Sequence, residues 1–188
     1  MASSSLHPKR WACVVGILVC LLFGWVAFVR GSGVPLLGLV DLGFHELGHL
    51  LTYPFPEVVT AMMGSIAQVA VPLGVALYFL FLRREQLGAA LCLAWAATSA
   101  QNVSVYIADA PSQMLPLLGD GEHDWAFVLG RFDAIDSAAA IAAFVNGFGM
   151  VLLFAGFALC VWSLLVDEGP ARRQDLSGSP SPAQWTSR

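Results

Sequence analysis

The chain has 188 residues, of which 57% are hydrophobic and 12% are charged, and its formal net charge is −4. The charged share is about half of that in soluble globular domains, and the composition as a whole indicates a membrane protein. Nucleic-acid binding is not expected, because no cluster of Lys and Arg is available to neutralise phosphates. The four cysteines form no CxxC pair, so the sequence indicates neither a thiolate zinc site nor a redox pair.

The apolar runs predict an all-α fold, a polytopic helix bundle of about five transmembrane helices, since roughly 20 apolar residues cross the bilayer core. The expected spans are 11–29, 34–53, 61–82, 87–107 and 137–166. They form one transmembrane domain, 11–166, between a polar N-terminal tail, 1–10, and a disordered tail, 167–188. The first run is longer than a usual signal peptide core and is interpreted as an uncleaved span. The Lys and Arg distribution leaves the orientation open.

The second expected span carries four ionisable side chains that are costly in lipid: Asp41, His45, Glu46 and His49. Such residues within a span indicate a functional site. Three of them belong to an HExxH motif, which on a helix puts both histidines on one face, where they can bind one Zn²⁺. Glu46 lies beside them and is the candidate catalytic base for zinc-activated water. The alternative is a buried hydrogen-bond cluster between helices.

A catalytic zinc site usually has three protein ligands and a water, so the motif needs one ligand from elsewhere. The candidates are Asp109, Glu122, His123 and Asp124. We favour His123, because imidazole is a preferred zinc ligand, or Asp109, because it ends a polar stripe on the fourth span. At about 1.5 Å per residue His49 lies roughly 6 Å below the membrane interface. The site is thus expected to be shallow and to open toward the 110–136 loop.

Other polar residues could support the metal ligands or bind substrate. Asp41 lies one helical turn before His45 and could fix its tautomer through a hydrogen bond, or it could face a water-filled cavity. Gln68 and Asn102 could bind a substrate carbonyl or stabilise an oxyanion, with interhelical hydrogen bonding as the alternative. Asp124 is a further candidate for these supporting roles.

The segment Phe44–Leu50 resembles the active-site helix of the site-2 protease family of intramembrane zinc metalloproteases. In that family a later span supplies an aspartate ligand, from a motif that pairs an asparagine with an aspartate. Asn102 and Asp109 form a similar pair here, although the family's prolines and its Leu-Asp-Gly are absent. The resemblance implies a divergent, minimal member, with the two motif histidines as zinc ligands and Glu46 as the base.

We therefore expect a multi-pass integral protein of the cell membrane, surrounded by membrane lipids and carrying Zn²⁺ as its cofactor. The expected reaction is hydrolysis of a peptide bond in a transmembrane or membrane-proximal protein substrate. A zinc hydrolase that acts on a lipid amide or ester is an alternative, because the same chemistry serves both. A second alternative is a non-catalytic membrane protein, either a pseudoprotease or a metal-binding carrier.

Overall fold

The computed structural model describes residues 8–116 and 122–176, and all regular structure within them is helical. This confirms the expected all-α class. Six α-helices lie in the described residues: α1 (Pro8–Gly24), α2 (Leu37–Thr52), α3 (Glu57–Leu77), α4 (Gln86–Asp109), α5 (Asp124–Arg131) and α6 (Ala138–Leu176). π-Helical turns prolong α1 through Trp25–Val29 and α3 through Tyr78–Arg83, and a 3-10 turn, Ile135–Ser137, precedes α6.

Within the described residues, three helical stretches are long and apolar enough to cross a membrane: Arg10–Val29, Glu57–Arg83 and Ile135–Leu165. They correspond to the first, third and fifth expected spans. The helix α2 has 16 residues, or about 24 Å, which is short of the roughly 30 Å hydrocarbon core. The helix α4 is longer, at 24 residues, but its polar side chains lower its hydropathy. Spans at α2 and α4 therefore stay a prediction.

The segment boundaries differ from the expected ones mainly near the C-terminus. The helix α6 continues to Leu176, beyond the expected end of the fifth span at 166. The tail expected to be disordered thus begins in helix, and its remainder, 177–188, lies outside the described residues, as do 1–7 of the N-terminal tail.

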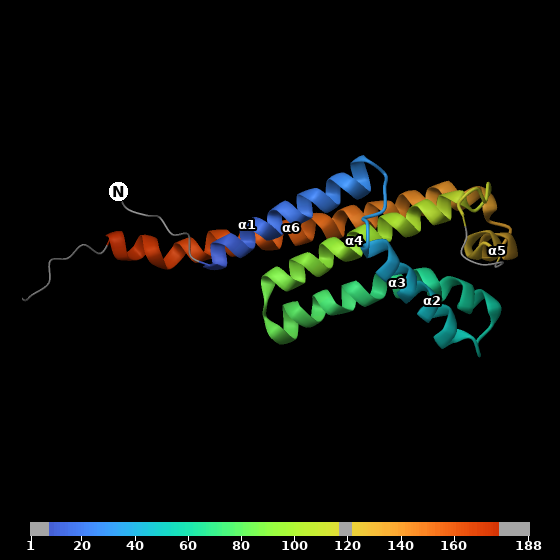
Figure 1. Ribbon diagram of the computed structural model, residues 1–188, viewed down its shortest axis with the longest axis horizontal. Coiled ribbons are helices and arrows are strands. Elements are labelled where there is room, and N and C mark those ends of the chain that lie inside the picture. The colour runs from blue at the N-terminus through green and yellow to red at the C-terminus, as the bar shows by residue number, and fades with distance from the viewer. Residues whose placement is uncertain (1–7, 117–121, 177–188) are drawn as a thin grey trace, which may run out of the picture.

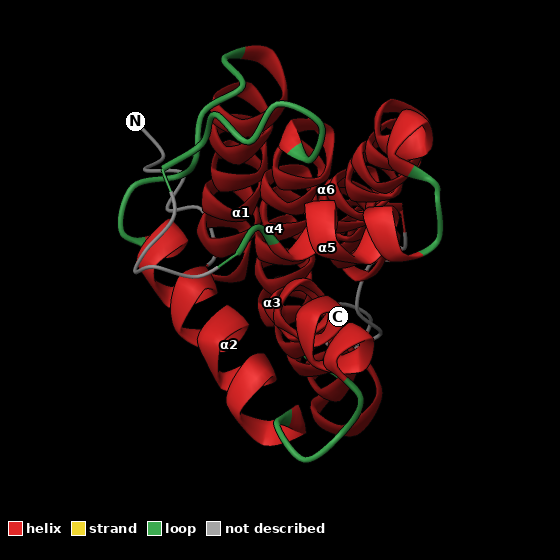
Figure 2. Cartoon of the chain, turned by 90° about the vertical axis from the view of Figure 1, so that its right-hand side faces the viewer, coloured by secondary structure: helices red, strands yellow, loops and turns green. Residues whose placement is uncertain are grey.

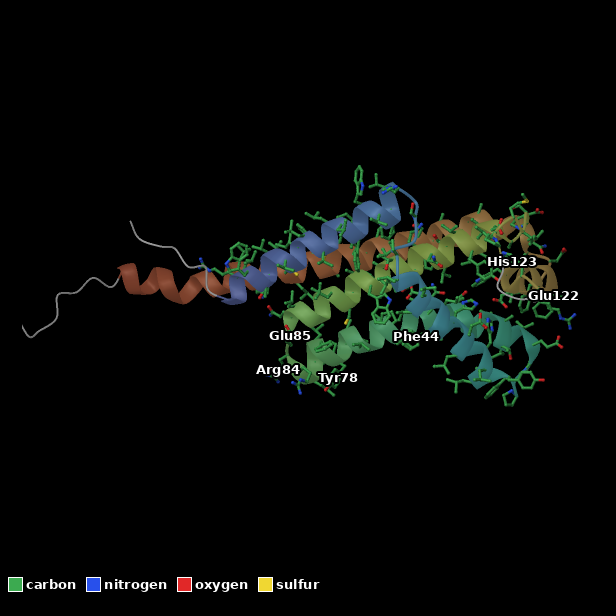
Figure 3. All side chains as sticks on the ribbon, in the orientation of Figure 1. Phe44, Tyr78, Arg84, Glu85, Glu122 and His123 are labelled. Atoms are coloured by element: carbon green, nitrogen blue, oxygen red, sulfur yellow. The ribbon has the colours of Figure 1, made fainter. Side chains whose placement is uncertain are left out.

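Three long helices, α1, α4 and α6, run side by side as one layer, and the α2–α3 hairpin packs along α4 (Figure 1). The short helix α5 lies across one end of this bundle, where it contacts α3 and α4 (Figure 2). At the opposite end, Arg84 and Glu85 form the turn between α3 and α4 (Figure 3). Glu85 caps α4 there by accepting hydrogen bonds from the backbone amides of Leu87 and Gly88.

The centre of the bundle is α4, which packs most extensively against α6. Small side chains make this possible, and six alanines of α4 have no exposed surface: Ala89, Ala90, Ala94, Ala96, Ala97 and Ala100. On the facing side, a Cβ at Gly149 would lie 2.9 Å from the carbonyl oxygen of Ala97, and one at Gly156 would lie 2.8 Å from that of Ala90. Close contact through small residues is typical of helices that pack in lipid.

The helix α2 runs beside the second half of α4. The carboxylate of Asp41 lies against Trp95 and Ser99 in the middle of α4, and the His45 ring lies against Tyr106 near its end. Gly48 lets α2 approach α3, because a Cβ there would overlap the backbone carbonyl of Met63. The HExxH segment is thus held between α3 and α4 at the end of the bundle that α5 covers.

Candidate metal centre

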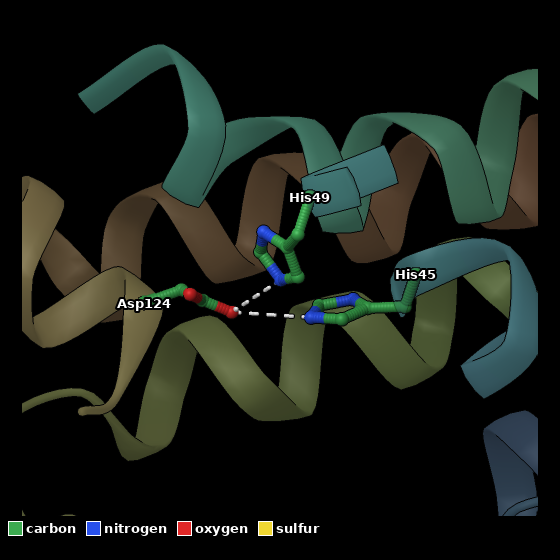
Figure 4. Close-up of side chains that lie close together, drawn as sticks. All are labelled: His45, His49 and Asp124. Carbon is green, nitrogen blue, oxygen red and sulfur yellow. Dashed lines mark hydrogen bonds and ion pairs between the residues drawn. The ribbon is translucent and has the colours of Figure 1, made fainter. Parts of the chain in front are cut away.

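The two motif histidines face the same point. One helical turn apart on α2, their rings lie with centroids 4.7 Å apart. The Nε2 atom of His45 is 3.1 Å and that of His49 is 3.4 Å from the same carboxylate oxygen, Oδ2 of Asp124 (Figure 4). One ligand atom from each of the three residues lies within 4.8 Å of the others. His45, His49 and Asp124 could therefore hold a metal ion.

The start of α3 fixes the orientation of His49. Its Nδ1 lies 2.8 Å from the backbone carbonyl oxygen of Thr60, so Nδ1 is the donor in this contact and Nε2 is the nitrogen that faces Asp124. A second hydrogen bond, from the Thr60 hydroxyl to the carbonyl of Thr52 at 2.8 Å, ties the two helices together at this point. Metal-binding histidines commonly donate their other ring N–H to a carbonyl in this way.

A glycine on α3 provides the space for both imidazoles. A Cβ at Gly64 would lie 2.5 Å from Nε2 of His49 and 2.7 Å from Nε2 of His45. Both distances are far below an ordinary van der Waals contact, so any larger residue would occupy the space of the rings. The backbone of α3 thus forms one wall of the centre, directly behind the nitrogen atoms that face Asp124.

The third side chain of the group comes from the first residue of α5. The hydroxyl of Tyr106 on α4 accepts a hydrogen bond from the Asp124 amide at 3.1 Å and donates one to its Oδ2 at 3.3 Å. The indole of Trp125 donates to the Ser65 hydroxyl on α3 at 3.0 Å. His123 caps α5, because its Nδ1 accepts from the amide of Ala126. These contacts with α3 and α4 hold the Asp124 carboxylate in front of the two histidines.

His123 and Asp109, the favoured third ligands, lie beside the centre and contact each other. The His123 side chain is fully buried, and its ring stacks on that of Tyr106 with centroids 4.2 Å apart. Its Nε2 lies 3.5 Å from Oδ2 of Asp109, too long for a well-formed hydrogen bond, and has no hydrogen-bond partner among the described residues. The structure thus groups Asp124, rather than His123 or Asp109, with the motif histidines.

The Asp109 carboxylate is used by the loop that follows α4. It accepts hydrogen bonds from the backbone amides of Met114 at 3.0 Å and Leu115 at 2.9 Å, and from the hydroxyl of Ser112 at 2.7 Å. Partial desolvation raises the pKa of Asp109, but these hydrogen bonds, helped by nearby His123, hold the pKa below its usual value. Asp109 therefore organises the loop as a charged acceptor.

Two clefts open onto the centre. The larger has a volume of about 610 Å³ and is lined by His45, the exposed carboxylate of Glu46, and the amide side chains of Gln68 and Asn102. The smaller, of about 420 Å³, lies between the α2–α3 turn and α5. Three residues line both clefts: His49 and Asp124, which belong to the centre, and Glu122. Glu46 is thus positioned in the space from which water or substrate would reach the histidines.

The predicted supporting residues are engaged mainly in helix contacts. Oδ1 of Asp41 accepts hydrogen bonds from Trp95 Nε1 at 2.7 Å and from Ser99 Oγ at 2.9 Å, which tie α2 to α4. No hydrogen bond between Asp41 and His45 is found in the described part of the chain. The Gln68 amide donates to the Asn102 oxygen at 3.3 Å, so the interhelical contact is present, while both residues also line the larger cleft.

Tyr106 was not predicted as a site residue. It belongs to the polar stripe of the fourth expected span, and its ring lies between His45 and His123. The useful signal was its position on that stripe, one turn after Asn102.

Comparisons of the chain with protein-family models, with curated proteins and with solved structures give no match. The function is therefore inferred from the chemistry of the site.

Proposed function

We propose that this protein is a multi-pass membrane zinc hydrolase that cleaves a peptide bond in a transmembrane or membrane-proximal protein, as a divergent and minimal member of the site-2 protease family. One observation carries this proposal. Two imidazoles and a carboxylate converge at one point inside an apolar helix bundle, and the glutamate of the HExxH motif lines the cleft that opens there.

The donor set suits zinc. Catalytic zinc sites commonly combine two histidines with one carboxylate and leave the fourth position for water. In a tetrahedral site with bonds of 2.0–2.2 Å, neighbouring ligand atoms lie about 3.3–3.6 Å apart. The separations from Oδ2 of Asp124, 3.1 Å to Nε2 of His45 and 3.4 Å to Nε2 of His49, are close to this spacing, and the shorter one is also a hydrogen-bond distance. The recess at Gly64 leaves room for both rings without strain in the helices.

In the proposed reaction the chain's own residues orient the metal ligands and move protons. When bound, zinc supplies a Lewis acid that brings the pKa of a coordinated water to about 7. Glu46 accepts the proton of the attacking water and returns it to the leaving amine, the usual work of a general acid–base residue. The Thr60 carbonyl fixes the tautomer of His49, and the Tyr106 hydroxyl holds Asp124 through two hydrogen bonds.

A membrane setting agrees with the proposal. Three helical stretches of the described chain could cross a membrane, and we propose that α2 and α4 complete a five-span bundle in the cell membrane. The polar stripe of α4 then faces α2 and the larger cleft, shielded from lipid by its neighbours. The site lies at the α5 end, so that water can reach the centre from that membrane face.

Metal analysis of the purified full-length protein tests the zinc centre. We expect about one zinc per chain in the wild type, in His123→Gln and in Asp109→Asn, and none in His49→Ala or Asp124→Ala, which remove proposed ligands. Circular dichroism of each variant checks that the helices are retained. Zinc that survives both His49→Ala and Asp124→Ala would refute the centre.

The variant Glu46→Gln separates a hydrolase from a non-catalytic metal protein. It removes the proton acceptor but no proposed ligand, so it should retain zinc and lose turnover of a peptide library read by mass spectrometry. Asp133→Asn is the matched control, because it makes the same carboxylate-to-amide change at an exposed residue that lines neither cleft. Undiminished turnover in Glu46→Gln would exclude the mechanism.

A further inference from the structure

The smaller cleft has the features of a side-chain pocket. Its volume of about 420 Å³ falls within the range of pockets that bind ligands. It begins at His49 and Asp124 and extends away from the larger cleft toward the α2–α3 turn. A molecule that reached the metal from the larger cleft would therefore continue into this pocket on the other side of the centre.

The wall of this pocket is mainly apolar and aromatic. Tyr53 and Phe55 come from the turn between α2 and α3, Phe127 comes from α5, and Ala61 lies on α3. Tyr53 and Phe55 are 81% and 60% exposed, so the described residues leave much of their apolar surface uncovered beside the centre. Aromatic surface of this size is a strong source of binding free energy once it is covered.

Hydrogen bonds and prolines restrict the backbone that carries this wall. The turn is held by a hydrogen bond from the Phe55 amide to the Thr52 carbonyl at 2.8 Å and is flanked by Pro54 and Pro56, which restrict its backbone. On the other side, Phe127 lies one turn into α5, and its amide donates to the carbonyl of His123 at 2.9 Å. A pocket whose walls stand on two restrained stretches of backbone can select a side chain by size.

We infer that this pocket selects a large apolar side chain, such as that of Phe or Leu, on the substrate residue next to the bond that is cleaved. The inference rests on the proposed hydrolase and specifies its substrate. The polypeptide reaches the centre unwound, because a helix keeps its carbonyl groups in its own hydrogen bonds. The substrate residue on one side of the cleaved bond lies in the larger cleft, and the residue on the other side places its side chain between Phe55 and Phe127. Glu57 and Glu122 lie at the same pocket and disfavour an acidic side chain there.

Small hydroxamates on the zinc-loaded full-length protein in detergent test this assignment. The hydroxamate group binds zinc, and two sets of compounds place an Ala, Leu, Phe, Arg or Glu side chain on the acyl or on the amine side of that group. We expect affinity to rise about tenfold from Ala to Phe or Leu in one set only, as partial burial of such a side chain predicts. The Glu compound of that set should bind least.

Two variants locate the effect. Phe127→Ala and Phe55→Ala, the second at a more exposed residue, each remove part of the wall. In both variants the affinity advantage of the Phe compound over the Ala compound should fall several-fold in the selective set. The affinities of the other set of compounds should be unchanged. Leu51→Ala is the control, since Leu51 is 68% exposed on α2 and lines neither cleft. Zinc content of each variant confirms that the centre is intact.

The outcomes separate the two proposals. Equal affinities across the side chains, or a preference that persists in both variants, would overturn the pocket while leaving the hydrolase standing. A preference for Arg over Phe would overturn the apolar assignment and make the two glutamates the determinant. Failure of acetohydroxamate itself to bind the zinc-loaded protein would remove the open metal centre, and the proposed function with it.

Discussion

Gly64 offers a sharp test of the metal centre, because replacing it with Ala adds one methyl group directly behind the ligand atoms. The new Cβ would lie 2.5 Å from Nε2 and 2.7 Å from Cε1 of His49, and 2.7 Å from Nε2 of His45. The atoms it meets are the far ends of two side chains, which can swing away. The helices can therefore keep their places, while the two imidazoles cannot keep theirs.

The expected loss follows from these distances. An ordinary contact begins at about 3.4 Å, so the rings must move by roughly 0.7–0.9 Å, whereas a metal site tolerates shifts of only about 0.2 Å in its ligand distances. Disturbing the support of a ligand typically lowers metal affinity by about 10- to 100-fold. Since both histidines are displaced, we expect Gly64→Ala to weaken zinc binding by at least the upper figure, about 100-fold.

Competition with a zinc-binding dye measures the affinity, and thermal unfolding followed by circular dichroism measures the stability. Gly74→Ala is the matched control on the same helix, because, apart from the adjoining turns of its own helix, no described part of the chain lies within 4 Å of the position of its Cβ. It should bind zinc like the wild type and be slightly more stable, since Ala favours a helix over Gly. Zinc affinity of Gly64→Ala equal to that of Gly74→Ala would refute a metal centre at this place.

Three further predictions concern neighbouring residues. Gly48→Ala should separate α2 from α3 and lower the melting temperature, because its Cβ meets the backbone carbonyl of Met63, which cannot move without the helix; an unchanged melting temperature would contradict the close approach. Tyr106→Phe should lower zinc affinity about 10-fold in the dye assay, since it removes both hydrogen bonds to Asp124; unchanged affinity would show that they do not position that ligand. The pKa of Asp109 is lower in the folded protein than its ordinary value. The Asp109 carboxylate therefore stabilises the loop at 110–116 above that ordinary pKa, and this stabilisation is lost as the pH falls below about 4. Asp109→Asn should loosen the same loop at neutral pH, as faster hydrogen exchange by mass spectrometry, and unaltered exchange would count against this role.

The positions of His45 and His49 could be predicted because they depend only on local structure. Residues at i and i+4 share a helix face whatever the rest of the chain does, and both rings do face one point. The all-α class followed in the same way from the apolar runs. Whether α2 crosses the membrane depends on its neighbours, since a short helix with ionisable side chains can lie inside a bundle that shields them.

The grouping of Asp124 with the histidines could not be deduced from composition or spacing. His123 and Asp124 are adjacent at the start of α5, and only one of them can face the histidines. His123 is turned to cap the helix and Asp124 is held by Tyr106 on α4, so the choice depends on how a short helix docks. A histidine preferred for its chemistry as a zinc ligand thus serves as a helix cap.

The sequence after Asp109 gives a weak indication of the structural role of this residue. Asp109 is followed by Pro111 and Ser112, a pattern typical of a turn in which a carboxylate accepts backbone hydrogen bonds. The loop amides and a serine hydroxyl do bind this carboxylate. Its spacing from Asn102, which resembled a ligand motif, proved compatible with a structural role at the end of α4.

The alanine seam of α4 has a mechanical consequence. Alanine has no side-chain rotamers to exchange, so the close packing of α4 against α6 offers little compliance, and α4 forms a stiff support against which the α2–α3 hairpin packs. Asp41 anchors that hairpin to α4 one turn before His45. Tyr106 on the same helix holds Asp124, so one rigid helix sets the distance between the motif histidines and the carboxylate that faces them.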